Sequence, residues 1–119
     1  MKKIFLFDID NTICTTKKNF YKKSIPKKNM IDKINNLKLN GHKVKVFTSR
    51  YMGRNNEKSK TVKKKYFNTT KKQLIKWGLK FDELIMGKPS YDFHIDDKSF
   101  NSRSKKTENI LRKYGKPKK

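Results

Sequence analysis

The residues best suited to chemistry are aspartates that occur in two close pairs. The chain has 119 residues, of which only 10 are acidic, and four of these form the pairs Asp8/Asp10 and Asp96/Asp97. Each pair follows a short apolar run. Carboxylates can act as nucleophiles, transfer protons or bind hard divalent cations. Because the chain also carries 33 Lys and Arg residues, paired aspartates indicate a site more than a solvated surface.

Two further polar groups occupy equivalent places in the sequence. Thr48 and Ser49 stand at the end of a second apolar run, and Lys88 follows a third. The apolar runs predict short buried strands, at residues 2–9, 43–48, 81–86 and 91–95. Ligands of open α/β sheets bind beyond the carboxyl ends of the strands. We therefore expect the four polar groups to meet at one edge of a sheet.

Helical patterns separate these strands. Apolar residues at helical spacing predict four helices, over about 30–39, 57–67, 69–77 and 104–114, with Gly41 and Gly78 as stop signals. Residues 11–26 are expected to form a polar loop or a small hairpin. Alternating strands and helices favour parallel pairing with right-handed crossovers. The sequence thus predicts a small three-layer α/β fold with a mostly parallel sheet, as one domain over residues 1–114, followed by a basic, frayed tail at 115–119.

The composition argues against several protein classes. No stretch approaches the roughly 18 consecutive apolar residues of a membrane-spanning helix. The apolar run Ile4–Phe7 is interrupted at once by Asp8, which is unlike a signal peptide. Cys14 is the single cysteine, so the chain has no internal disulfide. We therefore expect no membrane association and a cytoplasmic location, or the host cytoplasm if the chain is viral.

The net charge of +23 has two interpretations. Of the basic residues, 29 are Lys and 4 are Arg, a bias that the codons of an AT-rich genome would produce, leaving a solvated lysine surface. The alternative is attraction to polyanions, seen as non-specific binding of nucleic acid. The lysines are spread in pairs along the chain, and no familiar nucleic-acid-binding motif is present.

Four segments, in order, resemble the motifs of the haloacid dehalogenase (HAD) superfamily of phosphotransferases. Asp8-Ile9-Asp10-Asn11-Thr12 matches the first motif, D-x-D-x-[TV]. The remaining three motifs are matched by Val46-Phe47-Thr48-Ser49-Arg50, Gly87-Lys88-Pro89 and Ile95-Asp96-Asp97. The gap between Thr12 and the first predicted helix is too short for an inserted cap domain. The resemblance therefore implies a capless member with a Rossmann-like fold.

The resemblance implies a Mg²⁺-dependent phosphomonoester hydrolase. Asp8 would be the nucleophile that forms an aspartyl-phosphate, and Asp10 the general acid and base. The Asp8 carboxylate, the Asp10 main-chain carbonyl and Asp96 would hold the Mg²⁺. Asp97 would either orient the ligands or bind the metal directly.

The same resemblance suggests residues for binding the substrate. Thr48, with Ser49 beside it, would hydrogen-bond a phosphoryl oxygen, and Lys88 would neutralise charge on Asp8 and the phosphate. Arg50 and Arg54 follow the second motif on a polar loop. They either grip the substrate, as the guanidinium fork allows, or are solvated loop charges.

Over the whole chain, the segments FTSRYMGR and MGKPSYDFHIDDKS look most like small phosphatases of bacterial capsule and surface-polysaccharide biosynthesis. This likeness implies a sugar phosphate or a similar small phosphorylated substrate. One alternative is a polynucleotide 3′-phosphatase, which the net charge of +23 would suit. Another is a non-catalytic binding module that keeps the fold. Capless sites are open, so the substrate would be large or enclosed by a neighbouring subunit of a homo-oligomer.

Overall fold

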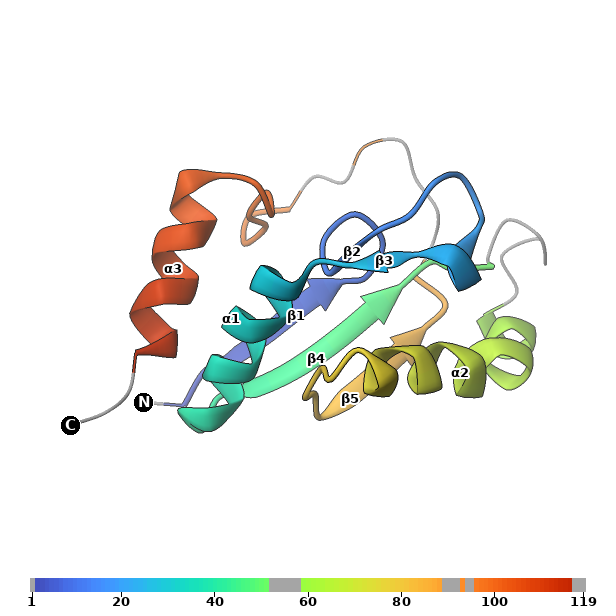
Figure 1. The fold of residues 1–119 in the computed structure, drawn as a ribbon, viewed down its shortest axis with the longest axis horizontal. Helices are drawn as coiled ribbons and strands as arrows, with labels where there is room; N and C mark the ends of the chain where they lie inside the picture. The colour runs from blue at the N-terminus through green and yellow to red at the C-terminus, as the bar shows by residue number, and fades with distance from the viewer. Residues whose placement is uncertain (1, 52–58, 89–92, 94–95, 117–119) are drawn as a thin grey trace.

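The computed structural model describes residues 2–51, 59–88, 93 and 96–116, and its arrangement is an α/β fold (Figure 1). The regular elements follow one another in the order β1 (Ile4–Asp8), β2 (Cys14–Thr15), a 3₁₀ turn (Tyr21–Lys23), β3 (Ile25–Pro26), α1 (Lys28–Leu39), β4 (Lys43–Thr48), α2 (Ser59–Lys76), β5 (Glu83–Met86) and α3 (Lys105–Gly115). The predicted fold class, an α/β domain of Rossmann-like type with a parallel sheet, is confirmed.

The main sheet has three parallel strands in the order β1-β4-β5. In its register, Asp8 lies opposite Phe47, and Thr48 lies opposite Met86. All three strands therefore end at the same edge, and Figure 1 shows them running in one direction. The prediction that several strand ends meet at one rim is confirmed for these three strands.

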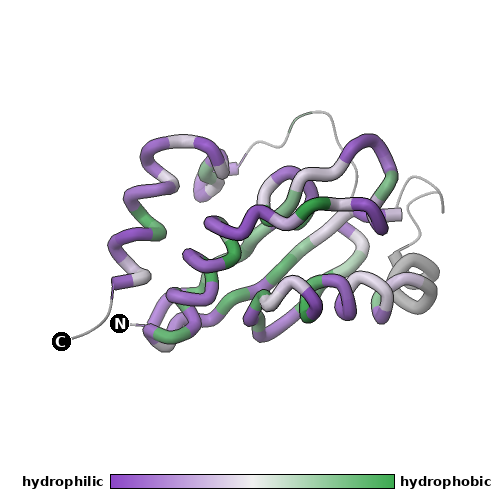
Figure 2. Tube along the Cα trace, in the orientation of Figure 1, coloured by the Kyte–Doolittle hydropathy of each residue, from purple (hydrophilic) through white to green (hydrophobic). Residues whose placement is uncertain are grey.

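One face of the sheet carries the core. Along β4, Val44 and Val46 are fully buried, because alternate residues of a strand point to the same face. The helices supply the other half of this core. Their buried apolar side chains are Ile31, Ile34 and Leu37 on α1, Leu74 on α2 and Leu111 on α3. Figure 2 shows the pattern as hydrophobic segments along the strands and a mostly hydrophilic α3.

The described helices form a single layer on that face. Tyr114 of α3 packs edge-on against Phe5, with ring centroids 5.7 Å apart, and α3 also packs against α1. On the opposite face of β1, Ile4 and Leu6 are 65% and 57% exposed. Of the three predicted layers, the described elements thus form two. The reason lies in β4, where Lys43 and Lys45 alternate with valines and make the strand amphipathic.

The helix ends follow the predicted stop signals, but the number of helices differs. Gly41 and Gly78 have φ angles of 84° and 81°, and each closes a Schellman turn, as in the bond from Leu79 N–H to the Leu74 carbonyl at 3.1 Å. Two separate helices over 57–67 and 69–77 were expected, and this expectation is wrong: α2 runs unbroken through this region. Its middle contains no Gly or Pro, and the buried Thr70 and Leu74 continue its core-facing side.

Two smaller expectations concern the loops and the end of the chain. The segment 11–26 does form a small hairpin, in which β2 pairs antiparallel with β3. The helix α3 includes Gly115, one residue past the expected end, and the expected fourth strand at 91–95 lies outside the described residues apart from the exposed Phe93. Among the described residues, no helix has the length and apolarity needed to cross a membrane.

Candidate active site at the carboxyl ends of the strands

Asp8 and Lys88, two predicted site residues, lie side by side. Asp8 is the last residue of β1, and its side chain is 36% exposed. The Lys88 main chain extends the pairing of β4 and β5, since its N–H donates to the Thr48 carbonyl at 2.9 Å. The Lys88 Nζ then lies 3.7 Å from Asp8 Oδ2 and 5.7 Å from the centre of the Phe47 ring. The structure therefore brings the proposed nucleophile and its cation together.

The surroundings of Asp8 only partly offset the cost of burying its negative charge. Its Oδ1 accepts a bond from the Ile9 N–H at 3.0 Å. Burial raises the pKa of Asp8 above its usual value, and the nearby Asp10 charge adds to this effect, while Lys88 and the Ile9 N–H oppose it. Such a carboxylate is less stabilised by its surroundings than a solvated one. Ionised Asp8 is therefore a cost to the fold.

Asp10 is held in a very different way, although it is only two residues further along. The Arg50 Nε donates to both of its oxygens, at 2.9 Å to Oδ2 and 3.1 Å to Oδ1. The Arg50 Nη2 donates to Oδ1 at 2.9 Å, and the Thr16 hydroxyl donates to the same oxygen at 2.6 Å. The Asp10 side chain remains 22% exposed, so it is fixed in place while one edge stays accessible.

The position of Arg50 differs from both expectations for it. Its side chain is 2% exposed, so it is neither a solvated loop charge nor a residue open to a substrate in solution. Its charge is committed to Asp10 instead. Arg54, the second arginine expected to bind substrate, lies outside the described residues.

Thr48 is also buried, at 1% exposure. It shares the core-facing side of β4 with Val44 and Val46, whereas Asp8 is in register with Phe47 on the other side. The Thr48 hydroxyl oxygen accepts a bond from the Arg50 N–H at 3.1 Å, which caps the turn after the strand. Ser49, between them, is half-buried.

The predicted metal-binding residues include two aspartates late in the chain. Asp96 and Asp97 are exposed, and the Asp96 Oδ1 accepts a bond from the Lys98 N–H at 3.2 Å within a tight turn. Across residues 2–51, 59–88, 93 and 96–116, no group of three or more His, Cys, Asp or Glu side chains is placed to hold a metal ion. The Asp10 carboxylate binds Arg50, and the metal site made of Asp8, the Asp10 main-chain carbonyl, Asp96 and Asp97 stays a prediction.

The donor chemistry of Asp8 alone still suits Mg²⁺. This cation is commonly bound by one or two carboxylates, with water and substrate phosphate completing its shell. The Asp8 carboxylate is a hard oxygen donor that is partly exposed at the strand ends. Asp8, with the Asp10 main-chain carbonyl, would be the protein's contribution to such a site.

The residues that sequence reasoning missed are those that hold Arg50. Gln73 of α2 accepts a bond from the Arg50 Nη1 at 2.5 Å, and Tyr21 lies under the guanidinium, 5.0 Å from ring centre to Cζ. Thr16 on the hairpin completes the set through Asp10. An arginine next to a buried strand end was a signal that partners would be needed, but nothing in the sequence named these three.

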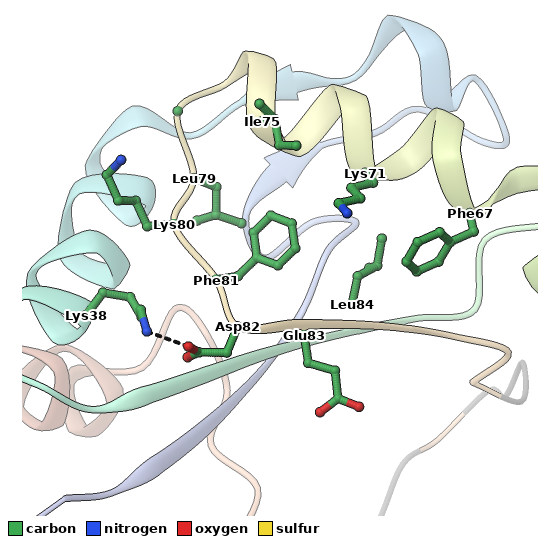
Figure 3. Close-up of a pocket in the computed structure, with 11 residues that line it drawn as sticks. Lys38, Phe67, Lys71, Ile75, Leu79, Lys80, Phe81, Asp82, Glu83 and Leu84 are labelled. Carbon is green, nitrogen blue, oxygen red and sulfur yellow. Dashed lines mark hydrogen bonds and ion pairs between the residues drawn. The ribbon is translucent and has the colours of Figure 1, made fainter.

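A pocket at the other end of the sheet contains none of these site residues. It lies where α2 meets β5, and its lining includes Phe67, Lys71, Phe81 and the ion pair of Lys38 with Asp82 (Figure 3). These residues come from the beginning of β5 and the helix surfaces beside it. The predicted chemistry therefore lies at the rim of strand ends and not in this pocket.

Comparison with known proteins identifies the fold. No protein-family model matches the chain, and no curated protein matches its sequence. Among solved structures, the crystal structure of a structural-genomics target from Vibrio cholerae is similar, with a TM-score of 0.78, 20% sequence identity and 97% of each chain covered. At this identity the likeness concerns the fold alone.

Proposed function

We propose that the protein is a phosphomonoester hydrolase that acts through an aspartyl-phosphate on Asp8. The observation that carries this proposal is the pairing of a poorly compensated carboxylate with a nearby cation, Lys88, 3.7 Å away, at the carboxyl ends of parallel strands. Ligands of such sheets bind at this edge. The resemblance of the four sequence motifs to HAD phosphatases supports the same chemistry, and the fold is compatible with it.

The reaction proceeds in two displacements. An Asp8 carboxylate oxygen attacks phosphorus, the bond from phosphorus to the ester oxygen breaks, and that oxygen leaves with a proton from Asp10. Water then attacks the phosphorus of the aspartyl-phosphate, Asp10 takes up a proton from that water, and phosphate departs as the Asp8 carboxylate is restored. Lys88 stabilises the negative charge that both steps concentrate beside Asp8. A Mg²⁺ bound at Asp8 would offset the repulsion between the carboxylate and the substrate phosphate.

The proposed substrate class is a small phosphorylated metabolite such as a sugar phosphate. This rests on the likeness of FTSRYMGR and MGKPSYDFHIDDKS to phosphatases of surface-polysaccharide biosynthesis. A second candidate, a 3′-phosphorylated polynucleotide, is favoured by one specific observation, the net charge of +23. The two differ in their response to salt, because contacts with a nucleic-acid backbone weaken steeply as salt rises.

The test is an activity panel on the purified protein, with Mg²⁺ or EDTA and at two salt concentrations. The substrates are para-nitrophenyl phosphate, several sugar phosphates and an oligonucleotide with a 3′-phosphate. We expect turnover that requires Mg²⁺, is highest on a sugar phosphate and changes little with salt. Preference for the oligonucleotide with steep salt dependence would replace the first substrate class by the second. Absence of turnover on every substrate, with the protein folded, would contradict the proposal and favour a non-catalytic binding module.

A further inference from the structure

The backbone of the turn after β4 fixes the position of the buried Arg50. Its N–H is bound by the Thr48 hydroxyl at 3.1 Å. The next residue, Tyr51, has a φ of 68°, a left-handed conformation that is unfavourable for a residue other than Gly. Tyr51 is nevertheless buried and stacks on Tyr66 with ring centroids 3.7 Å apart. The turn thus tolerates strain in a geometry that directs Arg50 inward.

Once inside, the guanidinium is held from three separate elements. Asp10, after β1, takes the Nε and Nη2 donors, with the shortest distances at 2.9 Å. Gln73, on α2, takes Nη1, and the Gln73 amide in turn donates to the Tyr21 carbonyl at 2.8 Å. Tyr21 also places its ring 5.0 Å from the Arg50 Cζ. A side chain fixed at so many points presents its donors in one orientation.

That orientation determines how Asp10 is presented. A side-on contact of Nε and Nη2 with a carboxylate fixes both its position and its plane. The Thr16 hydroxyl, 2.6 Å from the Asp10 Oδ1 that Arg50 Nη2 also contacts, further restrains the carboxylate. Because the Asp10 side chain is 22% exposed, the clamp leaves part of the carboxylate accessible.

We propose that Arg50 is a positioning residue that orients the Asp10 carboxylate to activate the water that hydrolyses the Asp8 aspartyl-phosphate. This inference rests on the proposed function. In the step concerned, the water oxygen forms a bond to phosphorus, the bond from phosphorus to the Asp8 oxygen breaks, and its electron pair returns to Asp8. The water proton moves to Asp10, and phosphate is released. Arg50 touches neither the substrate nor the water.

The test compares Arg50→Lys with the wild type on para-nitrophenyl phosphate, in which the leaving group needs little help from an acid. A lysine keeps the charge but loses the fork that fixes the carboxylate. We expect kcat to fall by about 10–100-fold, a part of what a general base contributes. KM should fall in parallel, so that kcat/KM changes by less than about threefold, because the first displacement does not need the clamp. Stopped-flow traces should show a burst of nitrophenolate as the aspartyl-phosphate accumulates.

A role in folding alone would not produce this signature. The matched control is Arg112→Lys, which alters an exposed arginine that bonds Glu108 on α3 at 2.7 Å and should leave both constants unchanged. If Arg50→Lys does not fold, as judged by circular dichroism, Gln73→Leu loosens the same guanidinium without touching Asp10 and should give a smaller burst.

Two results would contradict the inference, and they are distinguishable. Equal losses in kcat and kcat/KM without a burst, in a folded variant, would show that Arg50 does not act on the hydrolysis of the intermediate, while leaving the phosphatase itself intact. If the Asp8→Asn variant instead turned over substrate at the wild-type rate, the proposed function would be wrong, and this inference would be wrong with it.

Discussion

Two carboxylates at opposite ends of the same sheet each face a lysine, yet their environments shift their pKa values in opposite directions. At the beginning of β5, Asp82 accepts a bond from Lys38 Nζ at 2.6 Å (Figure 3). It also accepts a bond from the Val44 N–H at 2.7 Å. These hydrogen bonds, the one from Lys38 above all, lower the pKa of Asp82 below its usual value. At the end of β1, Asp8 has its lysine 3.7 Å away, and burial raises its pKa.

The difference separates a carboxylate whose ionised form the fold stabilises from one whose ionised form the fold disfavours. Asp82 is ionised and fully engaged, so little of its charge remains for another partner. Asp8 is partly desolvated, and its ionised form would gain from a further cation. Carboxylates with perturbed pKa values of this second kind are enriched at functional sites. This contrast supports the proposal of a reaction at the strand ends and not at the beginning of β5.

The strongest way to test this contrast is to remove the two lysines in turn. Lys88→Met should lower kcat/KM by about 10²–10³-fold, by analogy with the loss of one group that stabilises developing charge. Lys38→Met should leave kcat/KM within about twofold, because its partner takes no part in the reaction. Steady-state kinetics on para-nitrophenyl phosphate measure both. Equal losses in the two variants would show that the two ends of the sheet do not differ in function.

The next effect is on stability, through Asp82→Asn. The neutral amide loses the charge that Lys38 and the Val44 N–H stabilise. Because this pair is partly exposed and screened by solvent, we expect the free energy of unfolding to fall by only about 0.5–1 kcal/mol at neutral pH. Because the folded pKa is lowered, this contribution is present above the unfolded value of about 3.9 and disappears as the pH falls through the folded value. Urea unfolding at several pH values should therefore show the gap between wild type and variant closing below about pH 4. A gap that persists in acid would contradict the assigned pKa direction.

The smallest expected change is in the stability of Asp8→Asn. A raised folded pKa means that the ionised Asp8 opposes folding at neutral pH, and the opposition is relieved when the group is protonated as pH falls. Replacing it by a neutral amide should therefore leave the melting temperature equal to or slightly above that of the wild type, in contrast to Asp82→Asn. Thermal unfolding by circular dichroism measures both variants. A clear fall in melting temperature for Asp8→Asn would mean that Asp8 is a structural residue.

The meeting of Asp8 and Lys88 could be predicted from the sequence, because parallel strands place their carboxyl ends on one edge whatever the details of packing. The inward turn of Arg50 could not. It depends on the left-handed backbone of Tyr51 and on Gln73, a residue of α2 that comes 23 positions later. Local patterns carry no information about such a partner, and a scarce arginine beside a predicted site resembled a substrate-binding group.

The fold shows the same division between what is local and what is not. The glycine stops at Gly41 and Gly78 were predictable, because a left-handed residue ends a helix wherever it occurs. The continuity of α2 was not, because the Asn68-Thr69-Thr70 stretch has low helix propensity and its helical state depends on packing through residues such as Leu74. The exposed second face of the sheet was readable in principle from the alternation of Lys43 and Lys45 with Val44 and Val46.

The most direct test of the central claim is to identify the atom that carries the phosphoryl group during turnover. The protein would be mixed with substrate and Mg²⁺, quenched in acid within milliseconds, digested and analysed by mass spectrometry for a phosphorylated peptide. We predict acid-stable, base-labile phosphate on the peptide that contains Asp8, absent in Asp8→Asn and unchanged in Asp82→Asn. Turnover without any phosphate on Asp8 in the quenched wild-type protein and in Arg50→Lys, where the intermediate should accumulate, would contradict the account.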